Sequence, residues 1–422
     1  MHTLNIARGT LRYDVCMKIY EVGGAVRDAL MGLPVQDRDW VVVGATKDDL
    51  LRLDYRPIGK DFPVFLHAKT REQYALARTE QKTGPGYHGF SFDTSKTVSL
   101  EEDLARRDLT VNAMARDESG HIIDPYGGQL DLERKVLRHV SDAFIEDPLR
   151  VLRVARFSAR FAQLGFSVAP ETTEMMKKMA ETGELDELRP ERVWQETNKA
   201  LVEKSPQQYF LVLRDCGALA RVFPELEALF GVPQPARWHP EIDTGIHVMM
   251  ALKIAAELSD KAEIRFAVLA HDLGKGTTPK KLLPGHRGHE ERSLKVLASL
   301  CARLPVPKNY QALAEAVARY HGLVHKASSL RPNTLHKIIV AVDGIRRPGR
   351  FEDFLIACEA DARGRKGLEE QAYPQAEILK CALHAARTVR VEETENSAKG
   401  KALGELIRQK QIEAISAALK TH

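Results

Sequence analysis

Two carboxylates separated by one residue stand directly before an apolar segment near the start of the chain. Asp37 and Asp39 flank Arg38, and residues 40–43 follow at once as Trp-Val-Val-Val. Because alternate residues of a β-strand point to the same face, the two carboxylates can converge on one point. Oxygen ligands of this kind suit Mg²⁺, the ion that bridges phosphates in phosphoryl and nucleotidyl transfer. The pattern therefore predicts a catalytic Mg²⁺ site at Asp37 and Asp39.

Two further segments have residue types that bind phosphate. Gly23 and Gly24 lie between a predicted strand and a predicted helix, where glycine lets a phosphate approach the backbone and exposed N–H groups favour an anion. Arg106 and Arg107 are placed at a predicted helix start, ahead of an apolar helix face, and guanidinium groups suit a triphosphate. Each segment alone also fits an ordinary turn or a solvated surface, but the paired carboxylates favour a phosphate site.

A stripe of arginines follows Glu146 and Asp147 on a predicted helix. Asp147 can cap this helix, and Pro148 suits its first turn. Asp147 also lies one turn before Arg150, so the pair can offer an acceptor and a donor to one base edge. A carboxylate accepts from the amine of cytosine or adenine, while an arginine donates to the ring nitrogen. At about 100° per residue, four arginines fall within about a third of the helix circumference. They are Arg150, Arg153, Arg156 and Arg160.

A second group of chemistry-bearing residues lies much later in the chain. His271 and Asp272 stand where an apolar helix ends, so an imidazole and a carboxylate protrude together. With His247 before them and Asp361 after them, the set has two imidazoles and two carboxylates, which suits a divalent transition metal. Any one of these histidines fits an ordinary core or surface role equally well. Further imidazoles that could bind a second metal or a phosphate are His286, His289 and His321.

The segments that must position these residues change in character along the chain. The predicted elements are strands at 18–22, 40–43, 63–67 and 73–78, a helix at 25–31 and a mobile loop at 81–99. They predict a small mixed sheet. From about Leu130 onward helical periodicity dominates, and a proline cluster around Trp238 marks a boundary near residue 235.

Composition sets limits on the class of protein. The 422 residues are enough for about three packing units, and a net charge of +4 does not by itself indicate nucleic-acid binding. The 5 cysteines form no CxxC pair, which argues against a disulfide scaffold and favours a reducing cytoplasm. No apolar run reaches the roughly 18 residues of a membrane span, so no membrane partner is expected. Residues 1–16 are predicted to be an N-terminal extension, with Met17 as a candidate start.

Five ordered motifs together resemble the bacterial class II tRNA nucleotidyltransferases, the CCA-adding enzymes, and the likeness runs in register from Met17 to the C-terminus. The motifs are Val22-Gly-Gly-Ala-Val-Arg-Asp28, Asp37-Arg-Asp39, Arg106-Arg-Asp-Leu-Thr-Val-Asn-Ala113, Asp124-Pro-Tyr-Gly127 and Glu146-Asp-Pro-Leu-Arg150. The resemblance implies addition of C, C and A to tRNA 3′ ends from CTP and ATP without a nucleic-acid template. By motif matching, Asp37 and Asp39 would hold Mg²⁺. The residues that would contact the incoming nucleotide are Gly24, Arg27, Arg107, Arg153 and Arg156, beside the base-reading pair Asp147 and Arg150.

The same resemblance implies an α+β architecture. A small mixed β-sheet, polymerase-beta-like nucleotidyltransferase head would occupy 17–138, an all-α neck and body 139–235, and an α-helical HD domain 236–422. The run from His271 to Lys275 resembles the HD phosphohydrolase superfamily, whose pattern of His, His-Asp and Asp is matched by His247, His271, Asp272 and Asp361. This implies metal-dependent phosphatase, 2′-nucleotidase and 2′,3′-cyclic phosphodiesterase activity, favoured by Ni²⁺ or another divalent transition metal.

Some questions stay open at the level of sequence. Related nucleotidyltransferases often have a third carboxylate on a later strand, but residues 73–77 contain none, and neither Glu72 nor Glu80 is assigned as general base. The alternatives are an A-adding or CC-adding enzyme, a bacterial poly(A) polymerase, or a non-catalytic tRNA-binding factor. The HD-type tail argues against the polymerase, and clustered carboxylates argue against a pure RNA binder. Monomer and homodimer are both compatible with the sequence.

Overall fold

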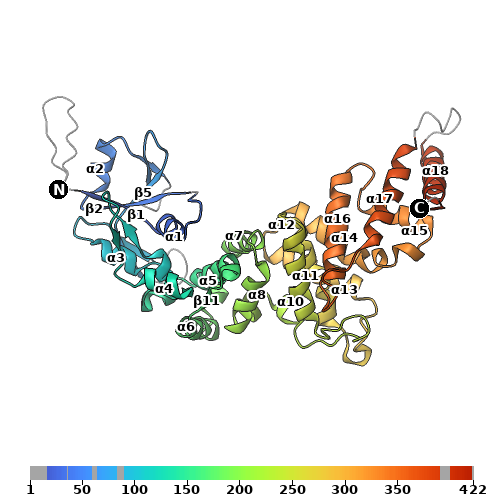
Figure 1. Cartoon of the computed structure of the whole chain (residues 1–422), viewed down its shortest axis with the longest axis horizontal. Coiled ribbons are helices and arrows are strands. Elements are labelled where there is room, and N and C mark those ends of the chain that lie inside the picture. Colours follow the sequence, from blue (N-terminus) through green and yellow to red (C-terminus); the bar gives the residue numbers. More distant parts are fainter. Residues whose placement is uncertain (1–16, 36, 59–63, 83–89, 390–399, 421–422) are drawn as a thin grey trace. The chain divides into compact units, whose positions relative to one another are not determined.

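The computed structural model describes residues 17–35, 37–58, 64–82, 90–389 and 400–420, with backbone only at 80–82 and 90–91. The chain divides into two compact units (Figure 1). The first comprises residues 1–188 with 215–218, and the second comprises residues 189–214 with 219–422. The narrower division expected from sequence, with boundaries at 138 and 235, remains a prediction.

A seven-stranded mixed sheet forms the head of the first unit, as predicted. Its order is β3-β4-β5-β2-β1-β8-β9, with β2 and β5 parallel and the other neighbours antiparallel. The strands are β1 (Lys18–Val22), β2 (Asp39–Val43), β3 (Arg56–Ile58), β4 (Val64–Leu66), β5 (Gln73–Leu76), β8 (Ala115–Arg116) and β9 (Ile122–Ile123). The helices of this unit are α1 (Gly24–Leu30), α2 (Lys47–Arg52), α3 (Leu100–Ala105), α4 (Gly128–Arg134), α5 (Leu149–Phe161) and α6 (Pro170–Glu181).

Alternation along β2 separates the two faces of this sheet. Val41 packs with Leu100 and Leu104 of α3 on one face, and Val42 packs with Leu50 of α2 on the other. Asp39 shares the face of Val41, since the two residues are two apart in a strand. The apolar packing of β2 therefore fixes the direction in which the Asp39 carboxylate points.

Two predictions about the head are wrong. The segment 81–99 is not a loop throughout, because β6 (Thr79–Lys82) pairs antiparallel with β7 (Phe90–Asp93), whose Phe-Ser-Phe-Asp sequence alternates as a strand does. Residues 83–89 lie outside the described part. Arg106 and Arg107 follow a helix rather than begin one, since α3 starts earlier at a capping box between Ser99 and Glu102.

The second unit is helical, in agreement with the predicted all-α character. Its helices are α7 (Pro190–Leu201), α8 (Pro206–Asp215), α9 (Ala218–Val222), α10 (Pro224–Glu227), α11 (Thr244–Leu258), α12 (Ala262–Ala270), α13 (His289–Arg303), α14 (Lys308–Val324), α15 (Pro332–Ala341), α16 (Pro348–Arg363), α17 (Pro374–Thr388) and α18 (Lys401–Lys420). The apolar helix α12 is buried along its length and packs against α11, α14 and α16. Among the described residues, no helix combines the length and apolar character that a membrane span requires.

Candidate active sites

Two features of the turn between β1 and α1 favour glycine at position 23. Gly23 has a φ of 72°, a left-handed conformation that disfavours other residues. A Cβ atom at this position would also lie 2.9 Å from Nη1 of Arg107. The turn therefore brings the Arg107 guanidinium directly against the backbone. Arg107 is held from the other side by Asp103, 3.1 Å from Nη2, while its buried Nε has no hydrogen-bond partner among the described residues.

Asp37 and Asp39 lie beside this turn. Asp39 begins β2 and pairs with Val22, the residue before Gly23. Both carboxylate residues are exposed. Partial desolvation raises the pKa of Asp39, the positive charge of Arg107 opposes that rise, and neighbouring Asp37 adds to it. The structure thus brings together the glycine turn, Arg107 and both carboxylates, which are far apart in the sequence.

Arg27 backs the same turn from the interior of the first unit. Its Nη2 lies 3.4 Å from the position that a Cβ on Gly24 would take, and its side chain pairs with Asp28 at 2.7 Å. The guanidinium also donates to Asn112 and lies over the ring of Phe157 in α5, 5.2 Å from its centroid. Arg27 therefore links the glycine turn to helix α5.

Two arginines of α5 form ion pairs with carboxylates of the head. Nε of Arg153 lies 2.7 Å from Oδ2 of Asp108, and Nη2 of Arg160 lies 2.9 Å from Oδ2 of Asp28. Burial alone would raise the pKa of Asp108, but Arg153 and hydrogen bonds from Asn112 and the backbone hold it well below its usual range. These ion pairs fix α5 against the segment that follows α3.

At the start of α5, both residues of the predicted base-reading pair bond to the protein backbone, and their contact with a base remains a prediction. The carboxylate of Asp147 accepts from the backbone N–H of Leu149 at 3.0 Å, as expected for a cap. Arg150 is buried and donates to the carbonyl oxygens of Ala143 and Arg106, the latter at 2.6 Å. The guanidinium of Arg156 lies 4.4 Å from the centroid of the Phe157 ring.

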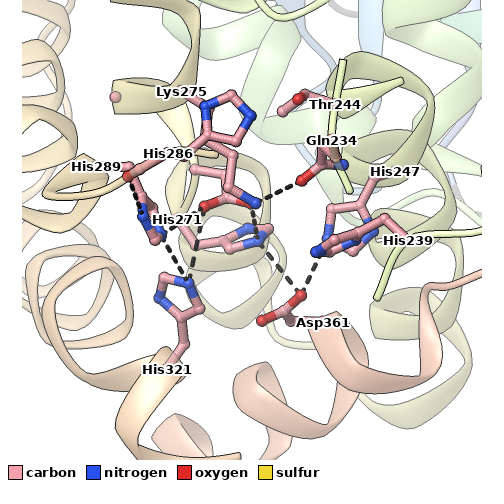
Figure 2. A network of polar contacts seen from close by, with 12 residues as sticks. Gln234, His239, Thr244, His247, His271, Lys275, His286, His289, His321 and Asp361 are labelled. Atoms are coloured by element: carbon pink, nitrogen blue, oxygen red, sulfur yellow. Dashed lines mark hydrogen bonds and ion pairs between the residues drawn. The ribbon is translucent and has the colours of Figure 1, made fainter. Parts of the chain in front are cut away.

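In the second unit, three helices bring the predicted metal ligands to one buried point (Figure 2). His247 comes from α11, His271 and Asp272 follow α12, and Asp361 comes from α16. Nε2 of His271 lies 3.1 Å from Oδ2 of Asp272 and 3.5 Å from Oδ1 of Asp361. Nε2 of His247 lies 3.0 Å from the same Asp361 oxygen. All four side chains are buried.

The other predicted imidazoles divide into two groups. His289 and His321 point toward Asp272, with Nε2 atoms 3.3 Å and 3.7 Å from its Oδ1. His286 instead has its Nδ1 2.9 Å from Thr278 and its Nε2 3.1 Å from the carbonyl oxygen of Pro233. His289 and His321 thus belong to the cluster, whereas His286 packs beside it.

Several residues of this cluster are not among those predicted. Nε2 of His325 lies 2.7 Å from Oδ2 of Asp361, and Nζ of Lys275 lies 2.6 Å from Oδ2 of Asp272. Oε1 of Glu241 lies 3.1 Å from Nδ1 of His247. The spacing of His325 one helical turn after His321 and the position of Lys275 in the His-Asp run were available signals. No sequence pattern marks Glu241.

The electrostatics of the cluster suit a bound cation. Burial acts to lower the pKa of His271, but the carboxylates of Asp272 and Asp361 raise it to about 10. Nε2 of His271 and both carboxylate oxygens of Asp272 are buried without a hydrogen bond among the described residues. Buried polar atoms of this kind are costly without compensation. The Lys275 ammonium compensates part of the Asp272 charge, and a bound cation would compensate more. The donor set of imidazoles and carboxylates therefore fits a divalent transition metal.

A cavity of about 890 Å³ opens beside this cluster. Its lining includes Asp272, His321, Asp361, Lys275, Arg365 and Trp238. Nε of Arg365 is buried without a hydrogen-bond partner among the described residues, and its Nη2 lies 4.0 Å from Oδ1 of Asp361. The cavity is large enough for a small phosphorylated ligand and places cationic groups close to the carboxylates.

Comparisons with known proteins find three family matches along the chain. The family described as Poly A polymerase head domain matches residues 19–138, the one described as probable RNA and SrmB-binding site of polymerase A matches 165–230, and the HD domain matches 244–343. The multifunctional CCA protein of Thioalkalivibrio sulfidiphilus is 58% identical over 400 residues, covering 94% of this chain and 98% of the relative. That of Nitrosococcus oceani is 58% identical over 406 residues, covering 96% and 99%.

Solved structures show the same fold at low sequence identity. A CCA-adding enzyme in its apo form II superposes with a TM-score of 0.65 at 20% identity, covering 96% of this chain and 92% of that chain. A structure described as a complex of CCA-adding enzyme with CTP gives a TM-score of 0.63 at 20% identity, covering 95% and 88%.

Proposed function

Because the chain belongs to the family of multifunctional CCA proteins, we propose that its head adds the terminal C, C and A of tRNA from CTP and ATP. The observation that carries this proposal is the meeting of Asp37 and Asp39 with Arg107 at the glycine turn. Carboxylates and a guanidinium on one open edge provide ligands for a metal and a partner for phosphates at the same place.

In the proposed mechanism Asp37 and Asp39 would hold Mg²⁺, which would supply charge stabilisation for the phosphates and lower the pKa of the attacking hydroxyl. Gly23 lets the triphosphate approach the backbone, because the position has no side chain. Arg107 donates to the phosphate oxygens through its terminal nitrogens, and Asp103 keeps that guanidinium in place. The Arg27 side chain packs against the backbone of Gly24 and so stabilises the turn.

Asp147 and Arg150 are proposed to select the base, with Arg153 and Arg156 beside them on α5. Asp147 would accept from the amine of cytosine or adenine, and Arg150 would donate to the ring nitrogen. Since Arg150 now donates to two carbonyl oxygens, it must exchange these bonds for bonds to the base. One of these carbonyls belongs to Arg106, next to the phosphate-binding Arg107. Base recognition and phosphate binding are thereby linked through one backbone segment.

The second unit is proposed to hydrolyse phosphomonoesters, nucleoside 2′-phosphates and 2′,3′-cyclic phosphates. His247, His271, Asp272 and Asp361 would hold one divalent transition metal, with Ni²⁺ suited to imidazole and carboxylate ligands. Such a metal would supply Lewis-acid chemistry to a phosphate ester and would lower the pKa of nearby water. Arg365 faces the adjoining cavity and is placed to take up the negative charge of a phosphate.

Incorporation of labelled nucleotides into tRNA trimmed by three nucleotides tests the head activity. We expect addition of C alone from CTP, no addition from ATP alone, and a complete CCA end when both are present. Addition confined to C, or to A on tRNA that already ends in CC, would indicate a CC-adding or A-adding enzyme. A long A tract from ATP alone would indicate a poly(A) polymerase. A cytoplasmic location and the choice between monomer and homodimer remain predictions.

A further inference from the structure

Trp238 is an exposed aromatic side chain in the wall of the cavity beside the His-Asp cluster. It is 58% exposed, although it is one of the residues that line this cavity. The other tryptophan of the second unit, Trp194, is instead buried against the rings of Phe266 and Tyr310. An exposed aromatic ring in a cavity wall provides a flat apolar surface that a ring-shaped ligand can cover. Trp238 is therefore a candidate for contact with a substrate.

The loop that carries Trp238, residues 233–243, is closed and ordered. The backbone N–H of Gln234 donates to the carbonyl oxygen of Ile242 at 2.7 Å, and that of Trp238 donates to the carbonyl oxygen of Pro235 at 3.0 Å. Ile242 has a φ of 64°, which a β-branched residue adopts only where the surrounding structure holds it. The loop thus presents the indole in a fixed position, which lowers the entropic cost of binding a ligand.

The same loop is tied to the cluster. Nζ of Lys275 lies 2.6 Å from Oε1 of Gln234 (Figure 2). His239, the residue after Trp238, has its ring centroid 4.7 Å from that of His247. Because consecutive Cα atoms are only about 3.8 Å apart, the backbone of Trp238 lies one residue from a group that contacts the cluster. A nucleotide, whose base and phosphate are separated by a ribose, can therefore reach both the indole and the cluster.

The charge of the cavity indicates which flat ligands fit it. Seven lysine and arginine residues line it, against three carboxylates. One of them, Arg365, has a buried Nε without a hydrogen-bond partner among the described residues. Another, Arg237, lies over the Trp238 ring, 4.8 Å from its centroid. Cationic groups favour a phosphate, and an exposed indole beside them favours a base. Together they fit a nucleotide better than a phosphorylated ligand without a ring.

We propose that Trp238 stacks on the base of the nucleoside 2′-phosphate or 2′,3′-cyclic phosphate that the second unit hydrolyses. This inference rests on the proposed hydrolytic function and adds the residue that makes the site prefer nucleotides. Arg237 holds the indole on one face, and the base would cover the other. Every base has a π-face, so the ring selects for the presence of a base rather than for its identity. The indole binds and orients the substrate and takes no part in bond breaking.

Two phosphomonoesters that differ in the presence of a base test the inference. The full chain loaded with Ni²⁺ is assayed with adenosine 2′-monophosphate and with glycerol 2-phosphate. In Trp238→Ala the ratio of kcat/KM for the first substrate to that for the second should fall by about 10- to 100-fold, through a higher KM for the nucleotide. Trp238→Phe keeps a ring and should lower the ratio less. The control Val340→Ala removes a half-exposed side chain of α15 outside the cavity lining and should leave the ratio unchanged.

The outcomes separate this inference from the function on which it rests. A ratio that Trp238→Ala leaves unchanged, or an equal loss on both substrates, would overturn base stacking while the hydrolytic function stands. No hydrolysis of either substrate by the unsubstituted chain would overturn that function as well.

A binding measurement provides a readout other than activity. Trp40→Phe with Trp194→Phe leaves Trp238 as the only tryptophan of the chain. With a chelator present to prevent hydrolysis, adenosine 2′-monophosphate should quench the fluorescence of this indole to a saturating level, because a stacked base lies against it. Glycerol 2-phosphate should not quench it. Fluorescence that the nucleotide leaves unchanged would contradict the stacking.

Discussion

The site in the head and the cluster in the second unit use carboxylates in opposite ways. Asp37 and Asp39 are exposed at the start of a strand, beside a turn made of backbone. Asp272 and Asp361 are buried among imidazoles. The oxygens of Asp361 have hydrogen bonds with His247 and His325, whereas those of Asp272 have none among the described residues. An exposed carboxylate pair needs less compensation without a ligand, because water still reaches it. A buried one needs more, since the loss of hydration must be offset by a charge held in the protein.

This difference suggests that the head binds its metal transiently and that the second unit binds its metal permanently. The head is suited to a metal that arrives and leaves with a nucleotide, whose phosphates complete its coordination. The second unit is suited to a resident metal, because its ligands are preassembled in a buried place. Removing a ligand in the head should therefore abolish chemistry without affecting stability. Removing metal from the second unit should affect both.

The largest effect is expected from Asp39→Ala in the head. The substitution removes one ligand of the proposed Mg²⁺ and should lower both C and A incorporation by roughly a thousandfold or more, because a bound metal supplies several kcal/mol of transition-state stabilisation. Thermal stability and tRNA binding should change little, since the side chain is exposed. Incorporation assays with CTP and with ATP, together with a thermal melt, provide the measurement. Normal incorporation by this variant would refute the metal assignment.

The matched control for this experiment lies in the other unit. His271→Ala combined with Asp272→Ala should remove phosphatase activity stimulated by Ni²⁺, yet the enzyme should still complete tRNA that lacks its terminal A. If the pair only packs the helices, the double variant would lose stability and keep its phosphatase activity per folded molecule. Assaying both reactions on one preparation of each variant decides between these outcomes.

Removal of metal should lower the thermal stability of the second unit but not that of the first. A ligand present at 100 times its Kd stabilises the state that binds it by about 2.7 kcal/mol, equivalent to roughly 5 to 10 °C for a unit of this size. The chain has 3 tryptophans, so Trp194→Phe with Trp238→Phe leaves Trp40 to report on the first unit. Trp40→Phe with Trp238→Phe leaves Trp194 to report on the second. A chelator should lower the melting temperature of the variant that reports through Trp194 and leave that of the Trp40 variant unchanged. Equal shifts in the two variants would contradict a resident metal in the second unit alone.

A smaller effect is expected at the base-reading pair of α5. Guanine and uracil present a carbonyl where cytosine and adenine present an amine, and an unpaired buried polar group costs roughly 1 to 3 kcal/mol. Asp147→Ala and Arg150→Ala should therefore weaken discrimination against GTP and UTP by about 10- to 100-fold. Because Arg150 also donates to two backbone carbonyls, its variant should lose stability as well. The ratio of kcat/KM for CTP and UTP is the measurement. A uniform loss of rate with unchanged selectivity would mean that the pair is purely structural.

The parts of the fold predicted from sequence are those that local spacing determines. The strands at 18–22 and 40–43, their mixed sheet and the helical second unit all follow from short-range periodicity. The position of Arg106 and Arg107 was misjudged because a capping box at Ser99 starts α3 earlier than the apolar pattern suggests. Local signals therefore identify elements well and their ends poorly.

Within the sites, tertiary partners account for what sequence did not reveal. The close approach of Arg107 to Gly23 depends on how α3 and β1 pack, which no spacing encodes. Arg150 was expected to face a base, but its observed acceptors are backbone carbonyls, and every residue has one of those. Glu241 contacts His247 from a loop without a recognisable motif. Contacts of this kind, between residues far apart in the sequence, can be found only in the folded structure.

Some carboxylates of the head that lie away from its open site are held ionised by protein partners. Asp49 is an example: its Oδ2 accepts from the backbone N–H of Thr46 at 2.9 Å and lies 2.9 Å from Nζ of Lys96. The hydrogen bond from Lys96, aided by those from Thr46 against the opposing effect of burial, lowers the pKa of Asp49 to about 2. This carboxylate completes the capping box of α2, whose Leu50 packs in the same apolar cluster as Trp40.

The smallest expected effect is therefore a pH-dependent loss of stability in Asp49→Ala. A pKa lowered in the folded state means that the ionised group stabilises the fold above about pH 4, and that this contribution disappears as the pH falls toward 2. At pH 7 the variant should be less stable by about 1 to 2 kcal/mol. Urea unfolding followed by Trp40 should show this gap closing between pH 4 and pH 2, while Asp48→Ala, an exposed neighbour, shows almost none. A gap that persists at low pH would mean that Asp49 acts through packing rather than through its charge.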